Sequence, residues 1–204
     1  MSTAEHGVRR YNHARMSPEF RRKNIRLSSV AYLGRRLYFV TLCFHRRKRF
    51  GLNPRIASWL IKNLRSHSVK AGFLIHAYCI MPDHMHVLTL GANGDSDLRS
   101  FIENFKQDTG FFFRTKRDAQ LWQFKYYDHI VRSEESAERI AAYIWTNPVR
   151  KGICRTIQEY PFSGALSDFG ILTFRAPTVQ PWTPPWKLQP SRALSQGERA
   201  ATDA

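Results

Sequence analysis

Acidic residues are scarce in this sequence. It has 16 Asp and Glu against 32 Lys and Arg, which gives a formal net charge of +16 and a pI near 10.3. Such an excess of positive charge is typical of proteins that bind a polyanion. The composition therefore predicts nucleic acid as the leading partner, with a membrane surface as the competitor.

Long apolar runs are missing as well. The chain has no stretch of about 18 apolar residues, the length that a membrane helix needs. It also has no basic helix with a broad face of Trp and Leu that would lie on a membrane. Residues 1–6 lack the apolar core of a signal peptide. We therefore expect a cytoplasmic protein with no membrane partner.

Cysteine is nearly absent. The 3 cysteines, Cys43, Cys79 and Cys154, are odd in number and lie in or beside apolar segments. Disulfides are rare in the cytoplasm, so we expect reduced thiols with no further role. A glycine-rich phosphate loop is also missing, and nothing in the sequence points to a nucleotide cofactor.

The 204 residues are enough for one well-filled domain with tails. Aromatic and β-branched residues predict strands at 36–44, 73–80 and 84–90, and a fourth strand or extended segment at 121–131. Apolar spacing and capping residues predict helices at 54–71, at about 98–109, and from 133–135 to Asn147-Pro148. This order is that of an α+β, ferredoxin-like (RRM-like) βαββαβ sandwich with an added C-terminal helix. Its first and third strands lie adjacent in the middle of the sheet.

Basic and aromatic clusters lie outside the predicted strands. Residues 1–35 form a basic arm, for which a merely solvated tail is the alternative. Arg46, Arg47, Lys48 and Arg49 follow the first strand and either clamp phosphates or line a solvated loop. Residues 111–113 are three phenylalanines, interpreted as core rather than as a base-stacking platform. We divide the chain into the arm (1–35), a folded domain (36–165) and a Pro/Trp-rich tail (166–204).

His84 and His86 open the third predicted strand. Residues two apart on a strand share a face, so both imidazoles point the same way while Met85 and Val87 point the other way. Two imidazoles on a rigid strand are a suitable pair of ligands for a divalent metal. The alternative is that they are two half-exposed polar side chains.

Tyr143 and Asn147 lie four residues apart on the last predicted helix and so share one of its faces. If this face covers the sheet, Asn147 can offer its carbonyl oxygen as a third ligand, and Tyr143 can act as a nucleophile on a polarised phosphodiester. A packed helix tyrosine is the alternative for Tyr143. Tyr126 and Tyr127 are rival nucleophiles that periodicity does not exclude.

Several motifs occur together in one order. They are residues 81–88 (MPDHMHVL), 122–123 (WQ), 127–132 (YDHIVR), 142–152 (AYIWTNPVRKG) and 160–163 (YPFS). In these motifs the chain resembles the single-tyrosine HUH transposases and, within them, the REP-associated tyrosine transposases. The resemblance covers roughly residues 36–165, which it identifies as the catalytic domain.

The resemblance implies a ferredoxin-like catalytic core, a divalent metal, usually Mg²⁺ or Mn²⁺, and single-stranded DNA with hairpins as substrate. By position, His84 and His86 match the paired ligands, Tyr143 the nucleophile, and Asn147 the third ligand. Other branches have Gln where this chain has Asn147. Asp83 stands where Asn is common in the family, and we expect its side chain to point away from the histidine pair.

We therefore predict a DNA transposase in which Tyr143 attacks a phosphodiester, forms a 5′-phosphotyrosine bond and releases a 3′-OH that later rejoins strands. The covalent bond stores the energy, so no nucleotide cofactor is needed. With one nucleophilic tyrosine per chain, two cleavages need two protomers or two rounds. The sequence therefore allows either a homodimer or a monomer.

The alternative is a hairpin DNA or RNA binding protein on an RRM-like sheet whose site no longer cuts, because basic charge and aromatics fit that function equally well. A pure binder has no need of the histidine pair, Tyr143 and Asn147 together. A two-histidine phosphoesterase would need two His-x-Ser/Thr motifs, and the sequence lacks such a pair.

Overall fold

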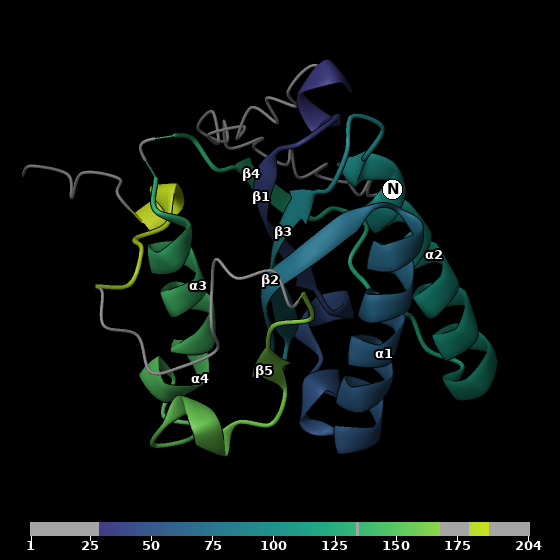
Figure 1. The fold of residues 1–204 in the computed structure, drawn as a ribbon. Helices are drawn as coiled ribbons and strands as arrows, with labels where there is room; N and C mark the ends of the chain where they lie inside the picture. The colour runs from purple at the N-terminus through teal and green to yellow at the C-terminus, as the bar shows by residue number, and fades with distance from the viewer. Residues whose placement is uncertain (1–28, 134, 168–179, 188–204) are drawn as a thin grey trace, which may run out of the picture.

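The computed structural model describes residues 29–133, 135–167 and 180–187. Its centre is an antiparallel sheet with the strand order β4-β1-β3-β2-β5 (Figure 1). The first and third strands lie side by side in the middle, as predicted, and the ferredoxin-like α+β class is confirmed. The strands are Leu37–Cys43 (β1), Phe73–Ile80 (β2), His84–Gly91 (β3), Tyr127–Ile130 (β4) and Ser163–Gly164 (β5).

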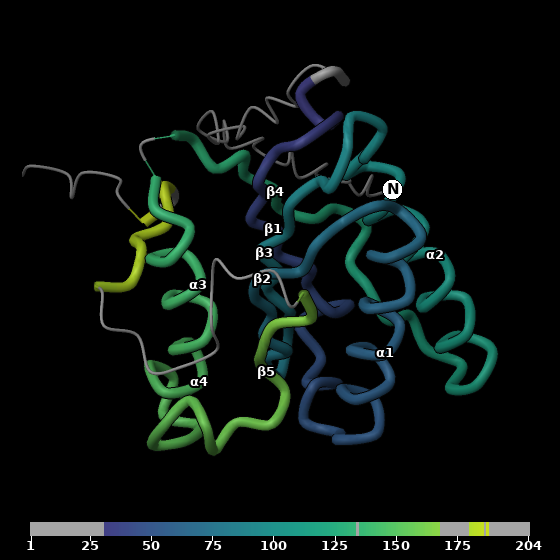
Figure 2. The backbone as a smooth tube through the Cα atoms, viewed as in Figure 1, coloured from purple at the N-terminus to yellow at the C-terminus, as the bar shows by residue number. Residues whose placement is uncertain are grey.

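Helices cover both faces of the sheet. Helices α1 (Pro54–Lys70) and α2 (Leu98–Arg117) lie on one side, and α3 (Ala137–Trp145) with the short α4 (Asn147–Arg150) lies on the other (Figure 1). The backbone tube shows the same separation of α3 from α1 and α2 by the strands (Figure 2). The sheet therefore divides the interior into two cores.

Side chains of β3 alternate between these two cores. Met85 and Val87 belong to the core beneath α1 and α2, whereas Leu88 belongs to the core beneath α3. The ring centroid of His86 lies 5.2 Å from that of Phe39, which is part of the α3 core. The prediction that the histidines share a face opposite Met85 and Val87 is therefore confirmed, and that face is the one covered by α3.

Helix α2 is longer than predicted. The sequence suggested an end near residue 109, but the helix continues to Arg117. Asp97 caps its start by accepting a hydrogen bond from the Arg99 amide at 2.9 Å. The extension is stabilised because the Phe113 ring is buried, with its centroid 4.9 Å from that of Phe50. Phe113 is thus core, as predicted for the three phenylalanines, while Phe111 and Phe112 are exposed and contradict that prediction.

Helix α3 begins later than predicted. Its cap is Ser136, whose hydroxyl accepts from the Arg139 amide at 3.2 Å, instead of Ser133. The Glu135 carboxylate is not part of the first helical turn, because it accepts hydrogen bonds from the His129 ring and the Arg132 amide. The predicted stop at Asn147-Pro148 is also only a break, since α4 starts there with its proline in the first turn, where a missing amide is tolerated.

The sequence predicted an irregular segment around residues 160–163. Residues 162–167 instead lie along the outer edge of β2 and contain β5. The Ile80 amide donates to the Phe162 carbonyl at 2.8 Å, and the Leu166 amide donates to the Ile75 carbonyl at 3.0 Å. Ser163 and Gly164 pair with β2 between these two bonds. The sheet thus gains a short fifth strand.

Two described segments from the predicted arm and tail pack on the domain. Tyr32 is buried, and the Tyr38 hydroxyl donates to the Ala31 carbonyl at 3.2 Å. Trp182 is buried in the α3 core. The predicted basic arm up to residue 28 and the tail segments 168–179 and 188–204 lie outside the described residues. Over the described ranges, the helices lack the combination of length and apolar character that a membrane crossing needs.

Candidate active site

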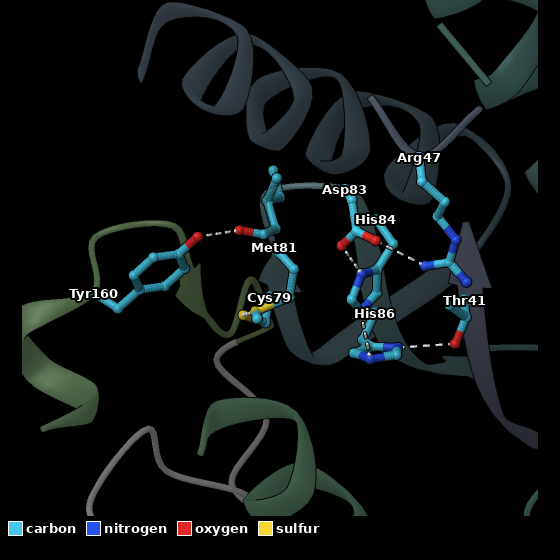
Figure 3. A network of polar contacts seen from close by, with 9 residues as sticks. Thr41, Arg47, Cys79, Met81, Asp83, His84, His86 and Tyr160 are labelled. Atoms are coloured by element: carbon cyan, nitrogen blue, oxygen red, sulfur yellow. Dashed lines mark hydrogen bonds and ion pairs between the residues drawn. The ribbon is translucent and has the colours of Figure 1, made fainter. Parts of the chain in front are cut away.

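The two histidines of β3 face each other. Strand β3 starts after a tight turn closed by a hydrogen bond from the Met81 amide to the His84 carbonyl at 2.8 Å. The Nε2 atoms of His84 and His86 are 3.0 Å apart. Figure 3 shows the two rings together, beside Asp83 and Thr41. The Nδ1 atom of His86 lies 2.8 Å from the Thr41 hydroxyl on β1. Each imidazole therefore has one nitrogen engaged by a neighbour and the other directed to the shared point between the rings.

This arrangement fits a divalent cation. Two imidazole nitrogens that each lie about 2.1 Å from one ion at a right angle are about 3 Å apart, the separation seen here. Ligating histidines generally also engage their second nitrogen with an oxygen, which fixes the ring and its tautomer. His86 is 4% exposed, which removes the half-exposed alternative for this residue. Burial, followed by the charges of His84, Arg150 and Arg47, holds the pKa of His86 well below its ordinary value, and a neutral imidazole is the form that binds metals.

Asp83 does not point away from the histidines, so that expectation is wrong. Its Oδ1 atom lies 2.6 Å from His84 Nδ1, and its Oδ2 atom lies 3.1 Å from a guanidinium nitrogen of Arg47 (Figure 3). The hydrogen bond with His84, helped by the charges of His84 and Arg47, lowers the pKa of Asp83 to about 2 although burial opposes the shift. The residue directly before a strand can turn its side chain back beside the first strand residue, which the alternation rule does not capture.

Tyr143 projects from α3 toward this histidine pair. Its ring centroid lies 5.8 Å from that of His86 and 6.1 Å from that of Phe39, and the side chain is 5% exposed. The Arg150 guanidinium lies over the same ring at 4.2 Å from the centroid, and its Nη2 donates to the Tyr143 carbonyl at 3.0 Å. The phenol is therefore placed beside the imidazoles with a cation against its ring.

Asn147 is less directly connected to the histidines. It is the first residue of α4, one turn beyond Tyr143, and it is 4% exposed. Over the described part of the chain, its side chain makes no hydrogen bond to either imidazole. Within the same ranges, no group of three His, Cys, Asp or Glu side chains gathers as a metal set. A third protein ligand would therefore be of another residue type, as the amide of Asn147 is.

The rival tyrosines are separated by the sheet. Tyr126 packs against the core beneath α1 and α2, with the Lys106 ammonium 5.4 Å from its ring centroid. Tyr127 turns to the other face, where its ring centroid is 6.3 Å from that of Phe39. Burial, then the charges of Asp128 and Glu135, raises the pKa of Tyr127 to about 12. Tyr127 is therefore the rival that shares a face with the histidines.

The predicted phosphate clamp 46–49 is a strained loop beside the site. Arg46 and Arg47 adopt left-handed backbone conformations, with φ of 51° and 56°, which are uncommon for residues with a side chain. The loop packs tightly on the turn before His84, because the Gly51 amide donates to the Pro82 carbonyl at 2.9 Å and a Cβ on Gly51 would lie 2.2 Å from the Met81 carbonyl oxygen. Arg47 is held on Asp83, while Arg46, Lys48 and Arg49 are exposed.

The family is shown by comparison with known proteins. The family model described as "Transposase IS200 like" matches residues 35–147, a stretch that runs from just before β1 to Asn147. The chain belongs to the IS200-like transposase family. The matched residues include both histidines, Asp83 and Tyr143.

Two curated relatives agree with this membership. The REP-associated tyrosine transposase of Escherichia coli (strain K12) is 29% identical over 91 residues, which are 45% of this chain and 53% of that protein. A relative from Haemophilus influenzae is 24% identical over 103 residues, which are 45% of this chain and 58% of its own length. The IS200-like chain thus spans a little over half the length of each of these two relatives.

A solved structure of a REP-associated tyrosine transposase bound to a REP hairpin has the same fold. It superposes with a TM-score of 0.56 at 24% sequence identity and covers 65% of this chain and 78% of that chain. The likeness supports the ferredoxin-like architecture of this IS200-like chain.

Sequence reasoning missed several side chains of this IS200-like site. Thr41 was missed because its place opposite His86 depends on the β1–β3 register. Arg150 lies seven residues after Tyr143, a spacing that returns to the same helical face and could have indicated it. Trp182 and Lys187 come from the far end of the chain, where no periodicity could relate them to Tyr143. The Trp182 ring centroid lies 5.8 Å, and the Lys187 ammonium 5.5 Å, from the Tyr143 ring centroid.

Proposed function

We propose that this IS200-like chain is a metal-dependent strand transferase that cleaves and rejoins single-stranded DNA near hairpins through a 5′-phosphotyrosine intermediate. The observation that carries the proposal is the meeting of His84, His86 and Tyr143 on one sheet face, with the imidazoles 3.0 Å apart and the phenol ring beside them. The family match and the net charge of +16 support DNA as the substrate.

A divalent ion, Mg²⁺ or Mn²⁺, would be held by His84 and His86, with the carbonyl oxygen of Asn147 as the proposed third ligand. When bound, such an ion polarises the phosphodiester and offsets the charge that develops on it. The protein's own contribution is to orient the ligands. Thr41 and Asp83 engage the Nδ1 atoms, so each ring keeps its Nε2 directed at the shared point.

The chemical step is a transfer between oxygens. The Tyr143 hydroxyl oxygen attacks the phosphorus, the new phenolic O–P bond forms, and the bond from phosphorus to the 3′ oxygen breaks. The phenolic proton lost by Tyr143 is balanced by the proton that the departing oxygen takes to become a 3′-OH. Attack of a 3′-OH on the phosphotyrosine runs the same exchange in reverse. Arg150, against the Tyr143 ring, is placed to offset negative charge near the phosphate.

The domain division and assembly are part of the proposal. We assign catalysis to residues 36–165, with the basic arm before it and the Pro/Trp-rich tail after it. With one nucleophilic tyrosine per chain, two cleavages need two protomers or two rounds, so the chain acts as a monomer or as a homodimer. The partner is single-stranded DNA that carries hairpins of the repetitive extragenic palindrome type.

The test is a covalent adduct between the protein and a hairpin-bearing single-stranded oligonucleotide, observed on a denaturing gel with Mg²⁺ or Mn²⁺. Tyr143→Phe should abolish the adduct while leaving the fold and hairpin binding intact, because it removes only a hydroxyl. Tyr127→Phe is the matched control on the same sheet face and should retain the adduct. An adduct that persists in Tyr143→Phe, or that forms fully in a chelator, would overturn the assignment.

A second candidate function is hairpin binding without cleavage. The burial of Tyr143 beneath Trp182 and Lys187 is the observation that favours it. The same protein and oligonucleotide, run on a native and on a denaturing gel, separate the two functions. A binder shifts the hairpin on the native gel and gives no adduct on the denaturing gel under any metal condition.

A further inference from the structure

A large cleft opens between α2 and the segment 120–128, on the far side of β1 from the histidines. Its volume is about 1150 Å³. One wall is formed by α2 residues, among them Lys106, Phe111 and Arg114, and the other by the chain that leads into β4, including Phe124 and Lys125. The proposed chemistry uses none of these five side chains.

Two phenylalanines on the cleft are left open to solvent. Phe124 is 87% exposed and Phe111 is 63% exposed. Phe113, two residues along α2, is instead buried in the core, so the exposure of Phe111 is not a property of the whole cluster. Large apolar side chains exposed in a cleft indicate a partner that covers them. Phenyl faces of this kind are the surfaces on which unpaired bases stack.

Cations accompany the two rings. Lys106 is fixed in the cleft, because its ammonium donates to the Phe124 carbonyl at 2.7 Å and lies 5.4 Å from the Tyr126 ring centroid. Arg114 and Lys125 line the same cleft and have no ion pair with another described residue.

The cleft also contains acids, and two of them are paired. Asp108 accepts from His67 at 3.0 Å, and Glu103 lies 4.0 Å from Arg99. Asp128 is the third acid of the lining. Neither Asp108 nor Glu103 is paired with Arg114 or Lys125. The lining has four cations (Arg99, Lys106, Arg114 and Lys125) against these three acids, so a net positive charge remains for a phosphate backbone.

The inner wall of the cleft is bonded to β1, the strand next to the one that carries the histidines. The Gln123 amide donates to the Cys43 carbonyl at 2.9 Å, and Cys43 is the register partner of His84. Tyr127 lines the cleft and pairs with Thr41, which binds His86. A chain lying in the cleft therefore reaches the β4 edge, from which the Tyr127 ring turns to the face of the sheet that carries the histidines.

We infer that this cleft binds an unpaired segment of nucleic acid, with bases stacked on Phe111 and Phe124 and phosphates on Arg114 and Lys125. The inference rests on the proposed function only in taking the bound segment to continue toward Tyr143. Recognition by stacking tolerates any base and fails on a duplex, whose bases are already stacked. The cleft therefore holds the single-stranded part of the substrate, apart from any hairpin stem.

The test is the affinity for a fluorescein-labelled oligothymidine, measured by fluorescence anisotropy in a chelator at fixed salt. Phe111→Ala and Phe124→Ala should each weaken binding by roughly 5-fold or more, the loss typical of one stacked base. Phe124→Trp keeps an aromatic face and should bind as the wild type does. None of the three variants should change the affinity for a blunt duplex.

The control variant is Phe112→Ala. Phe112 is next to Phe111 on α2 and is 48% exposed, but it stacks on Trp59 outside the cleft at 5.2 Å between centroids. It should bind oligothymidine as the wild type does. Wild-type affinity in Phe124→Ala, an equal loss in Phe112→Ala, or no binding by the wild-type chain overturns the inference. If the wild-type chain binds oligothymidine through these two phenylalanines but forms no covalent adduct, the proposed function fails and the cleft assignment stands.

Discussion

At the scale of single residues, the Asp83 carboxylate orients the His84 ring. The Nδ1 atom of His84 is 2.6 Å from the Asp83 carboxylate, and the low pKa of Asp83 keeps that carboxylate ionised. An ionised carboxylate only accepts hydrogen bonds, so the His84 proton that it binds lies on Nδ1, and Nε2 is the nitrogen left to face His86. Arg47 holds the second carboxylate oxygen and so fixes the orientation of Asp83.

We predict that Asp83→Ala weakens Mn²⁺ binding by roughly 10-fold or more, because the orienting partner of a ligating histidine is lost. Asp83→Asn should lose less, since its amide oxygen can still accept the Nδ1 proton. Isothermal titration without DNA measures both affinities. Asp108→Ala is the matched control, because it breaks a similar carboxylate–histidine pair with His67 on the other side of the sheet. Equal Mn²⁺ affinity in Asp83→Ala and wild type would show that Asp83 has no positioning role.

At the scale of elements, hydrogen bonds hold the segment 180–187 against α3 and the residues just before it. Trp182 Nε1 donates to the Glu135 carboxylate at 3.0 Å, and the Trp182 amide donates to the Arg139 carbonyl at 2.9 Å. Glu135 also accepts from His129 and from the Arg132 amide. One carboxylate therefore joins the end of β4, the start of α3 and the segment that packs on Tyr143.

We predict that Glu135→Ala loosens this segment, so that the Trp182 amide exchanges its hydrogen faster while the amides of β3 are unchanged. Native-state hydrogen exchange followed by mass spectrometry is the measurement. Glu159→Ala removes a carboxylate that, among the described residues, bonds to Arg155 alone, and it should leave the Trp182 amide as in the wild type. Slow exchange at Trp182 in Glu135→Ala would mean that ring packing alone holds the segment.

Acidification should loosen the segment 180–187 in the wild type, as Glu135→Ala should. Burial alone would raise the pKa of Glu135, but the bonds from the Arg132 amide and His129 outweigh it and lower the pKa. A carboxyl whose pKa is lowered by folding contributes stability above its ordinary value near 4.5, and this contribution is lost as the pH falls through the folded value. The protection of the Trp182 amide, which is the intrinsic exchange rate relative to the observed rate at the same pH, should therefore fall on acidification below about pH 4.5 in the wild type, and much less in Glu135→Ala.

The elements also show what the sequence can predict. Strands β1, β2 and β3 lie within one residue of their predicted ends, because β-branched and aromatic runs bounded by turn residues leave little ambiguity. The end of α2 was wrong because Phe113 gains its burial from Phe50, a contact between segments distant in sequence. The start of α3 was wrong because Glu135 bonds to β4 instead of to its own helix. Tertiary contacts therefore decided both helix ends.

For the site, spacing alone placed His84, His86 and Tyr143 on facing surfaces, since alternation on a strand and the turn of a helix are local rules. The partners that orient them were beyond such rules. Thr41 depends on a strand register, Arg47 on two successive left-handed residues, and Trp182 on the path of the tail. The positions of these three side chains could thus be predicted, whereas the contacts that orient them could not.

At the scale of the whole molecule, the charge of +16 is not uniformly available to DNA. In the loop 46–49, Arg47 is engaged by Asp83, which leaves three of the four cations for phosphates instead of the full set that the sequence suggested. Each phosphate contact releases condensed counterion and contributes about 0.7 to 0.9 to the salt dependence of binding.

We predict that replacing Arg46, Lys48 and Arg49 together by Ala lowers the slope of log affinity against log salt by roughly two to three for a hairpin oligonucleotide. The matched control replaces Arg55, Lys116 and Arg117 by Ala. These substitutions remove the same charge from a hollow between α1 and α2. That variant should keep the wild-type slope. Equal slopes for both triple variants would mean that the loop is only solvated and that net charge governs binding.

The strand order has a consequence for how copies of the molecule can associate. An uncovered edge strand offers a row of unpaired amides and carbonyls that recruits strands from other chains. Here the outer side of β2 is bonded by residues 162–167 from Ile75 to Ile80, and at the opposite margin β4 extends over only four residues. A second protomer could continue the sheet across β2 only after displacing β5, and across β4 over only four residues. The strands in the described part of the chain therefore favour association through side chains of helices and loops.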